Sequence, residues 1–393
     1  MNHYRPRRRQ QVARRLGAWL CGAAIVAGNV AVAAGASAPA PEISDVAVLP
    51  PANAHRVWLV ELYSGQMQVV DGDSGDLLGS VYSASLSNFA SGRSNNRIYV
   101  AESVWSKGNR GTRQDMVTVY DGTTLKLVTE IALPGRVYMA PLTHNFAISA
   151  NGARGYVYNM QPAASVIVTD LTANRMLRSV DIPGCALAFP WGDNGFSSLC
   201  GNGSLATVSL DGPHPAIKRS EVFFDAENDP VFDESPSNRS TGRTFFISYS
   251  GLVHPAILGA TPALEAPWSL QQAAGLQPAS VENGTLAWRP GGRLPFAVHG
   301  PSGRLYVLMH AGEPWSHKKE GTELWVADTK ERRVVRRMTL PTAVSAIAVS
   351  QDAQPLLYLV DVKETLTILD AMTLEEKKKV EQVRGVVPYV PDL

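Results

Sequence analysis

The sequence predicts an all-β protein, a seven-bladed β-propeller built from four-stranded antiparallel blades. Two repeating patterns support this fold: a hairpin that recurs about every 50 residues, and a further pair of strands that follows it and turns at an aspartate. A single four-stranded unit cannot bury both of its faces, whereas a ring of such units can. Seven copies of the hairpin therefore indicate seven blades in one ring.

The hairpin pattern consists of a small residue and, seven positions later, an arginine or a turn residue that opens an apolar strand. Clear copies are "ASGRSNNRIYV" from Ala90, "AISANGARGYVY" from Ala147, "AVHGPSGRLYVL" from Ala297 and "AVSQDAQPLLYLV" from Ala348. The Gly, Asn, Asp and Ser residues between the strands predict tight turns. The second strand of each hairpin is expected to begin at Arg56, Arg97, Arg154, Gly195, Arg243, Arg304 and Pro355.

The second pattern is an alternating strand that ends in aspartate, followed by a short turn and another strand. Examples are "MVTVYDGTTLKLVTEIALPG" (116–135) and "ELWVADTKERRVVRRMTLP" (323–341). An aspartate at this place can accept hydrogen bonds from backbone N–H groups of the turn. We therefore expect turn chemistry, and not catalysis, from Asp71, Asp121, Asp170, Asp328 and Asp370.

Two loops are longer than the others, "VWSKGNRGTRQD" (104–115) and "HAGEPWSHKKEGT" (310–322). Both fall between the second and third strands of their units. Such connections gather on one side of a propeller, where binding surfaces commonly form.

The N-terminus has the layout of a secretory signal: a basic stretch, the apolar run "LGAWLCGAAIVAGNVAVAA" and the small residues "GASAPAP". We expect a signal peptide over residues 1–38, cleaved near 34–38, and a single propeller domain over residues 45–393. A membrane anchor is the alternative for the apolar run. The signal peptide hypothesis places the protein in the periplasm.

Removal of the signal changes the charge of the chain. Six of the 36 basic residues precede Ala34, which leaves 30 basic against 35 acidic residues. A mildly acidic chain argues against nucleic acid as a partner. No long apolar run follows the signal, so no membrane association is expected of the mature chain.

Cys185 and Cys200 are the two cysteines that remain after cleavage. An exported chain is exposed to an oxidising compartment, which favours a disulfide between them. Zinc would need further ligands close by, and a C-x-x-C redox motif is absent. The spacing predicts a bridge between the first two strands of the fourth unit.

No catalytic constellation stands out in the sequence. It contains no G-x-S-x-G, H-E-x-x-H or P-loop motif. The histidines are too scattered to suggest a metal site: His3, His55, His144, His214, His254, His299, His310 and His317. We therefore expect no catalytic residue, metal or cofactor in this chain itself.

Several stretches resemble the heavy subunit of methylamine dehydrogenase and aromatic amine dehydrogenase, the quinoprotein amine dehydrogenase family. They are "RGTRQDMVTVYDGTTL" (110–125), "LAWRPGGRLPFAVHGPSGRLYVLM" (286–309), "EPWSHKKEGTELWVADTKERR" (313–333) and "VSQDAQPLLYLVDVKETLTILDAMT" (349–373). The cysteine pair followed by "GNGSLATV" is similar too. The resemblance covers nearly the whole mature chain.

This resemblance implies a division of labour. The heavy chain is a periplasmic seven-bladed propeller, and the cofactor, tryptophan tryptophylquinone, resides in a separate light subunit. Two heavy and two light chains form a heterotetramer. The assembly oxidises a primary amine to aldehyde and ammonia and passes the electrons to a blue-copper protein of the amicyanin or azurin type. The heavy chain would supply walls of the substrate channel and part of the docking surface.

Three residues are candidates for these roles. The first-blade loop "ELYSGQMQ" (61–68) is shorter than in methylamine dehydrogenase, and Tyr63 is the nearest match to the family's channel aromatic. Trp105 and Trp315, in the two long loops, are candidate anchors for the light subunit. Whether the substrate is methylamine or an aromatic amine stays open.

Two other readings of the sequence remain. One is a stand-alone periplasmic propeller that binds a protein or small ligand without redox activity. The other is a self-sufficient propeller enzyme, such as a lactonase, which would need a central cluster of carboxylates or histidines for a metal.

Overall fold

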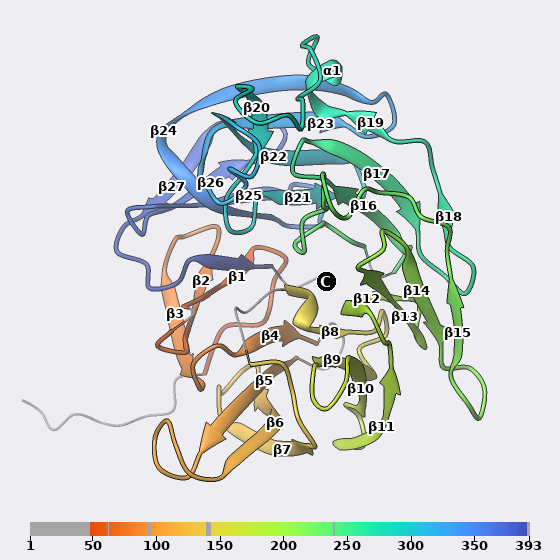
Figure 1. Cartoon of the computed structure of the whole chain (residues 1–393). Coiled ribbons are helices and arrows are strands. Elements are labelled where there is room, and N and C mark those ends of the chain that lie inside the picture. Colours follow the sequence, from red (N-terminus) through yellow and green to blue (C-terminus); the bar gives the residue numbers. More distant parts are fainter. Residues whose placement is uncertain (1–47, 62, 93–95, 139–142, 239, 391–393) are drawn as a thin grey trace, which may run out of the picture. The chain divides into compact units, whose positions relative to one another are not determined.

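The computed structural model describes residues 48–61, 63–92, 96–138, 143–238 and 240–390, all within a compact unit that runs from Val46 to Leu393. The signal peptide prediction for residues 1–38 falls outside these ranges. Nearly all regular structure is β, and the sheets of this unit are arranged around a common centre (Figure 1).

Consecutive strands pair antiparallel within each sheet. The first sheet has the spatial order β28(Val387–Tyr389)–β1(Arg56–Val60)–β2(Gln66–Asp71)–β3(Leu77–Tyr82). The second sheet is β4(Asn88–Ser91)–β5(Arg97–Trp105)–β6(Arg113–Asp121)–β7(Leu127–Leu133), and the third is β8(Phe146–Ile148)–β9(Arg154–Asn159)–β10(Ser165–Asp170)–β11(Arg175–Asp181). The fourth sheet is β12(Cys185–Trp191)–β13(Gly195–Cys200)–β14(Leu205–Ser209)–β15(Ala216–Arg219). The fifth comprises β16(Arg243–Ile247), β17(Leu252–Ile257), β18(Ala263–Leu264) and β19(Trp268–Ser269).

The remaining strands form one eight-stranded sheet. Its members are β20(Ala287–Pro290), β21(Phe296–His299), β22(Arg304–Gly312), β23(Gly321–Asp328), β24(Arg333–Val349), β25(Leu356–Asp361), β26(Leu366–Asp370) and β27(Glu376–Val380). Two short helices complete the regular structure of the described residues, η1(Thr143–Asn145) and α1(Leu270–Ala273).

The prediction of seven four-stranded blades is wrong. The described residues form five separate four-stranded blades, and the rest of the propeller is the continuous eight-stranded sheet. The cause is β24, whose first half pairs with β23 and whose second half pairs with β25. Its sequence "RVVRRMTLPTAVSAIAV" contains no Gly, Asn or Asp, and the strand continues through Pro341, where a break was expected.

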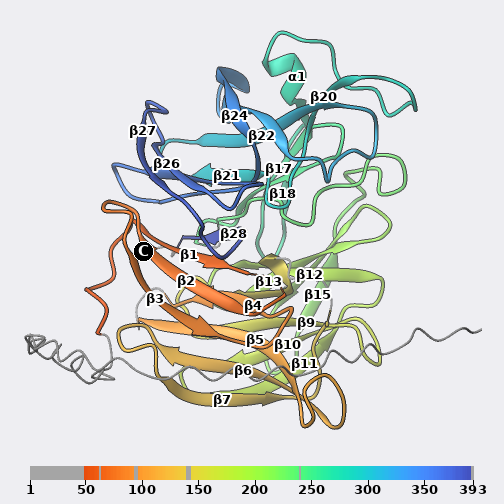
Figure 2. The same cartoon turned by 90° about the vertical axis from the view of Figure 1, so that its left-hand side faces the viewer.

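The first sheet departs from the hairpin pattern in another way. Its innermost strand comes from the opposite end of the chain, since β28 pairs with β1 through Trp58↔Tyr389 and Val60↔Val387. An inner strand was expected just before Arg56, and the described residues 48–55 form none. Figure 2 shows β28 beside β1. The ring is therefore closed by backbone hydrogen bonds between the two ends of the described chain.

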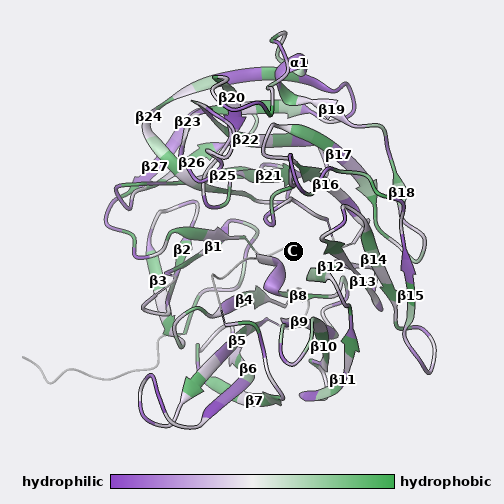
Figure 3. Cartoon of the chain, viewed as in Figure 1, coloured by the Kyte–Doolittle hydropathy of each residue, from purple (hydrophilic) through white to green (hydrophobic). Residues whose placement is uncertain are grey.

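Burial follows the position of a strand within its sheet. The inner strands β1, β13 and β25 are buried at every residue, since both faces pack on neighbouring sheets. The outer strands β15 ("AIKR") and β27 ("EKKKV") are almost fully exposed, and Figure 3 shows them as more hydrophilic. Charged side chains on these edges discourage pairing with other chains.

The aspartates at the strand ends act as turn acceptors, as the sequence predicts. Oδ1 of Asp121 accepts the N–H groups of Thr123 and Thr124, at 3.0 and 2.9 Å. These hydrogen bonds lower the pKa of the Asp121 carboxyl. Arg97, which opens the strand beside it, adds an ion pair at 3.0 Å. The same turn recurs at Asp71, Asp170, Asp328 and Asp370.

The predicted disulfide is present between Cys185 and Cys200, which face each other across β12 and β13. Both cysteines are buried in the cluster between the third and fourth sheets. Nη1 of Arg219, on the outer strand β15, lies 3.1 Å from each sulfur. The disulfide therefore connects the inner strands of the fourth sheet, and its sulfur atoms contact the Arg219 guanidinium of the outer strand.

Replacing both cysteines with alanine is expected to lower the free energy of unfolding by about 3 kcal/mol, the loop-closure value for fifteen residues. Urea denaturation of the variant and of the wild type measures this difference. As the control, a reductant should shift the wild-type midpoint toward that of the variant and leave the variant unchanged. Equal midpoints for the two oxidised proteins would contradict the prediction.

Candidate functional site

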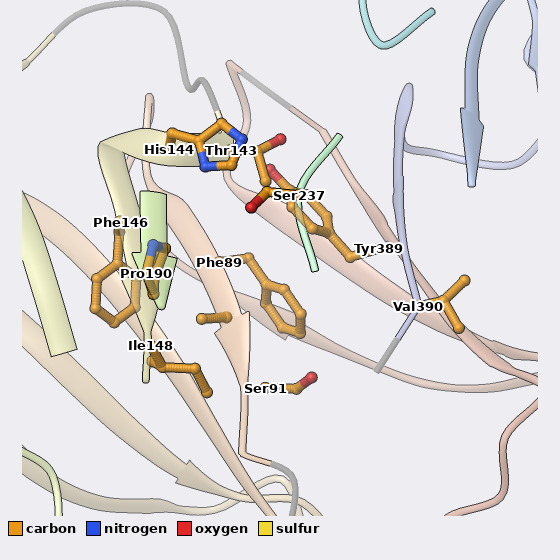
Figure 4. A pocket seen from close by; sticks show the side chains of 12 residues that line it. Phe89, Ser91, Thr143, His144, Phe146, Ile148, Pro190, Ser237, Tyr389 and Val390 are labelled. Carbon is orange, nitrogen blue, oxygen red and sulfur yellow. The ribbon is translucent and has the colours of Figure 1, made fainter. Parts of the chain in front are cut away.

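The centre of the ring contains two adjoining cavities of about 220 and 180 Å³. Both are lined by the innermost strands of several sheets, among them β4, β8, β21, β24 and β28. They share Thr143, His144, Ser237, Tyr389 and Val390. Figure 4 shows the first cavity, with Thr143, Ser237 and Tyr389 close together and the apolar side chains of Phe89 and Ile148 beyond them.

The short helix η1 (the yellow coil in Figure 1) lies at this centre and contacts residues of three sheets and their connections. The N–H of Thr143 donates to both carboxylate oxygens of Glu234, at 2.8 and 3.1 Å. Nε2 of His144 lies 3.1 Å from the carbonyl oxygen of Ser235, and its ring stacks on Phe189 at 3.8 Å. The helix therefore fills part of the channel between the third, fourth and fifth sheets.

Burial perturbs the pKa values of three titratable groups in the channel. Desolvation raises the pKa of Glu234 to about 7, and the nearby charge of Asp233 adds to this shift. Desolvation lowers the pKa of His144 to about 4, so its imidazole is neutral at pH 7. Tyr389 faces the same groups from β28, and burial raises its pKa. The channel thus holds a carboxyl group that titrates near neutral pH.

Glu234→Gln is expected to stabilise the protein at pH 8 by roughly 2–3 kcal/mol and to have little effect near pH 4. The folded protein binds the Glu234 proton more tightly than the unfolded chain does. The contribution of Glu234 to the free energy of unfolding is therefore largest below its ordinary pKa of 4.5. This contribution falls as the pH rises toward 7, and the full cost of burying the ionised carboxylate remains above pH 7. Urea unfolding at pH 4.5, 6 and 8 measures the effect, with the exposed Glu221→Gln as the control. A constant difference across this range would contradict it.

The residues predicted as site candidates lie on one face of the ring. Antiparallel meanders place the connections between the second and third strands at the same end of every sheet. We call it the long-loop face; its described residues include 61, 63–65, 106–112, 248–251 and 313–320. Tyr63 is 70% exposed there, and its backbone forms hydrogen bonds with Glu61 and Ser85. Among the residues that the structure describes, no aromatic ring packs against that of Tyr63.

Trp105 belongs to a cluster of aromatic rings and cations. Its ring meets Tyr138 edge-on at 4.8 Å, and the guanidinium of Arg113 lies 5.6 Å from the one and 5.5 Å from the other. The buried Arg136 supports this cluster through hydrogen bonds to Ser103 and Asn88. Burial lowers the pKa of the Arg136 guanidinium to about 10, so it keeps its charge. The arrangement is a preorganised aromatic surface.

Trp315 belongs to a second aromatic cluster. It is 51% exposed and meets Tyr249 edge-on at 5.8 Å. The ring of His317 stacks on that of Tyr249, with 3.8 Å between the ring centroids. Phe232 closes the group at 4.8 Å from Tyr249. Trp315 thus rests on a stacked support and presents half of its surface to solvent.

Sequence reasoning missed Tyr138, Tyr249, His317 and Glu234. All four lie in connections between strands or between sheets, where no periodic pattern marks a residue. The only available signal was proximity to a long loop, and that applies to His317 alone.

The two tryptophan clusters lie across the centre of the ring from each other, since β5 and β6 are on the far side of the centre from β22 in both Figure 1 and Figure 2. A partner that contacts both must therefore span the mouth of the central channel. Within the described ranges, no group of three or more His, Cys, Asp or Glu residues is placed to hold a metal ion. No helix in the same ranges is long and apolar enough to cross a membrane.

Residues 47–391 match the family model of the methylamine dehydrogenase heavy chain (MADH), which covers the whole ring and both tryptophan clusters. The chain belongs to the methylamine dehydrogenase heavy chain family. Membership supports a role as the heavy subunit of an amine dehydrogenase, and a heavy chain implies a light-chain partner.

Curated relatives of this family are similar over most of their length. The methylamine dehydrogenase heavy chain of Paracoccus versutus is 29% identical over 350 residues, which are 88% of this chain and 78% of the relative. That of Methylorubrum extorquens is 28% identical over 401 residues, 95% of this chain and 94% of the relative.

Solved structures of low sequence identity share the fold. A functionally unknown protein from Desulfotomaculum acetoxidans has a TM-score of 0.60 at 8% identity, covering 86% of this chain and 99% of its own. The dihydro-heme d1 dehydrogenase NirN has a TM-score of 0.56 at 16% identity, covering 87% and 77%. These likenesses concern architecture alone.

Proposed function

We propose that the chain is the heavy subunit of a periplasmic amine dehydrogenase that oxidises a primary amine to aldehyde and ammonia. The match to the methylamine dehydrogenase heavy chain family over residues 47–391 carries the proposal. In this reaction amine and water give aldehyde, ammonia, two protons and two electrons. A blue-copper protein of the amicyanin or azurin type receives the electrons.

The tryptophan tryptophylquinone cofactor belongs to the light subunit in this proposal and supplies the two-electron acceptor. No residue of this chain is assigned to chemistry. Its part is to hold the light subunit across the long-loop face and to line the path of the amine. Tyr63, exposed on that face, is the candidate for the path.

The light subunit would rest on the two tryptophan clusters, with two heavy and two light chains in the assembly. Three features support this placement. Trp and Arg are enriched at interface hot spots, and both occur in the Trp105 cluster. Trp315 is exposed although its support is ordered by ring stacking. A small subunit that spans both clusters would also cover the channel mouth and exclude water from it.

The pure chain is expected to show no amine oxidation with a dye acceptor, and co-expression with its light subunit is expected to give activity. The measurement is reduction of a phenazine dye with methylamine and with an aromatic amine, which also decides between the two substrate classes. A visible absorbance should co-elute with this chain only in the co-expressed sample. Turnover by the chain alone would contradict the proposal, and failure to capture any small subunit from the native periplasm would favour a stand-alone binding propeller.

A further inference from the structure

Glu234 is the most unusual charged group in the channel. Its side chain is 8% exposed and lines the cavity of about 180 Å³. A carboxylate can accept about four hydrogen bonds, yet Thr143 is the one residue described as donating to Glu234, with its N–H shared by both oxygens. No lysine, arginine or histidine among the described residues forms an ion pair with it. The carboxylate of Glu234 therefore lines the cavity with lone pairs that can still accept hydrogen bonds.

The rest of this cavity is suited to a small organic cation. Tyr389 contributes an aromatic ring, and Ser237 contributes a hydroxyl. The other walls are largely aliphatic, from Leu294, Val349 and Val390. An aromatic face beside a carboxylate attracts an ammonium group, whereas calcium needs six to eight oxygen ligands. The neutral His144 adds no positive charge that would repel a cation.

We propose that the central channel of this chain binds one small ammonium-type cation, ammonium or a primary alkylammonium of methylammonium size, at the carboxylate of Glu234. Its N–H groups donate to the free lone pairs of the carboxylate, and its charge replaces the missing counter-ion. The site goes beyond the proposed function, because it lies within this chain and needs no light subunit or quinone.

Thermal melting of the full mature chain at pH 8 tests the site. At this pH Glu234 is ionised and ammonium is protonated. At constant ionic strength, 100 mM ammonium chloride or methylammonium chloride is expected to raise the melting temperature of the wild type by about 2–4 °C over sodium chloride. Glu234→Gln should show no such difference, and the exposed Glu221→Gln should respond like the wild type. Tetramethylammonium, which has no N–H group, should have no effect.

Proton release provides a second measurement that needs no variant. Near pH 7 about half of Glu234 is protonated, so binding of ammonium should expel a proton, which calorimetry in two buffers of different ionisation enthalpy detects. An equal response of Glu234→Gln, a wild type indifferent to ammonium, an equal effect of potassium, or binding without proton release would each overturn the proposal. Because no light subunit is present, these outcomes are independent of whether the chain serves an amine dehydrogenase.

Discussion

A chain that ends at Gly385 is expected to lose its cooperative unfolding transition, because it lacks β28. This strand supplies the inner partner of β1 and covers Trp58 and Phe89, which are 2% and 3% exposed. Tyr389 packs on Phe89 at 5.4 Å, and Val387 is buried in the same cluster. Removing Val387 and Tyr389 and uncovering Trp58 and Phe89 costs more than about 5 kcal/mol, which is comparable to the whole stability of many domains.

The matched control is a chain that ends at Val390, which retains β28 and removes only the last three residues. It should melt like the full chain in calorimetry and circular dichroism. A chain ending at Gly385 that still melts in a single transition near the wild-type temperature would show that the first sheet is stable without its inner strand. The prediction would then be wrong.

Trp105→Ala and Trp315→Ala are each expected to weaken binding of the light subunit by about 2 kcal/mol or more, roughly thirtyfold in affinity. Each substitution removes a large ring that its neighbours hold in place: Tyr138 and Arg113 in one cluster, Tyr249 in the other. The double variant should lose more, since the clusters are too far apart to share contacts.

The control for the tryptophans is Met372→Ala. Met372 is 51% exposed, as Trp315 is, but it lies in a turn between third and fourth strands, on the opposite face of the ring. Its replacement should leave affinity unchanged. Affinity is measured by titration with the light subunit, beside the melting temperature of each variant. Wild-type affinity in both tryptophan variants would place the light subunit elsewhere.

The sequence predicts the repeating part of the fold well because its signals are local. Six of the seven expected second strands begin at the predicted residue, and β25 begins one residue later, at Leu356. The arginine that opens several of these strands pairs with the aspartate of the adjacent turn, as in Arg154 and Asp170 at 3.1 Å. Both partners belong to one short pattern, so the pattern can be read without knowledge of the tertiary structure.

What could not be predicted depends on contacts between distant segments. The pairing of β28 with β1 joins residues from the two ends of the chain, and no local pattern marks such a partner. Two units merge because β24 continues through Pro341, a residue that favours turns, so no local pattern indicates this continuation. Glu234 gains its raised pKa only when η1 and the inner strands enclose it.

The closing of the ring by β28 also determines when the protein can finish folding. Trp58 and Tyr389 are roughly 330 residues apart in sequence, and the entropic cost of joining them must be met before their contacts form. During synthesis β1 leaves the ribosome before β28 and keeps one unpaired edge until β28 has followed it. If the chain crosses a membrane N-terminus first, the same delay recurs on the far side. Factors that shield exposed strand edges would therefore act on the first sheet for longer than on any other.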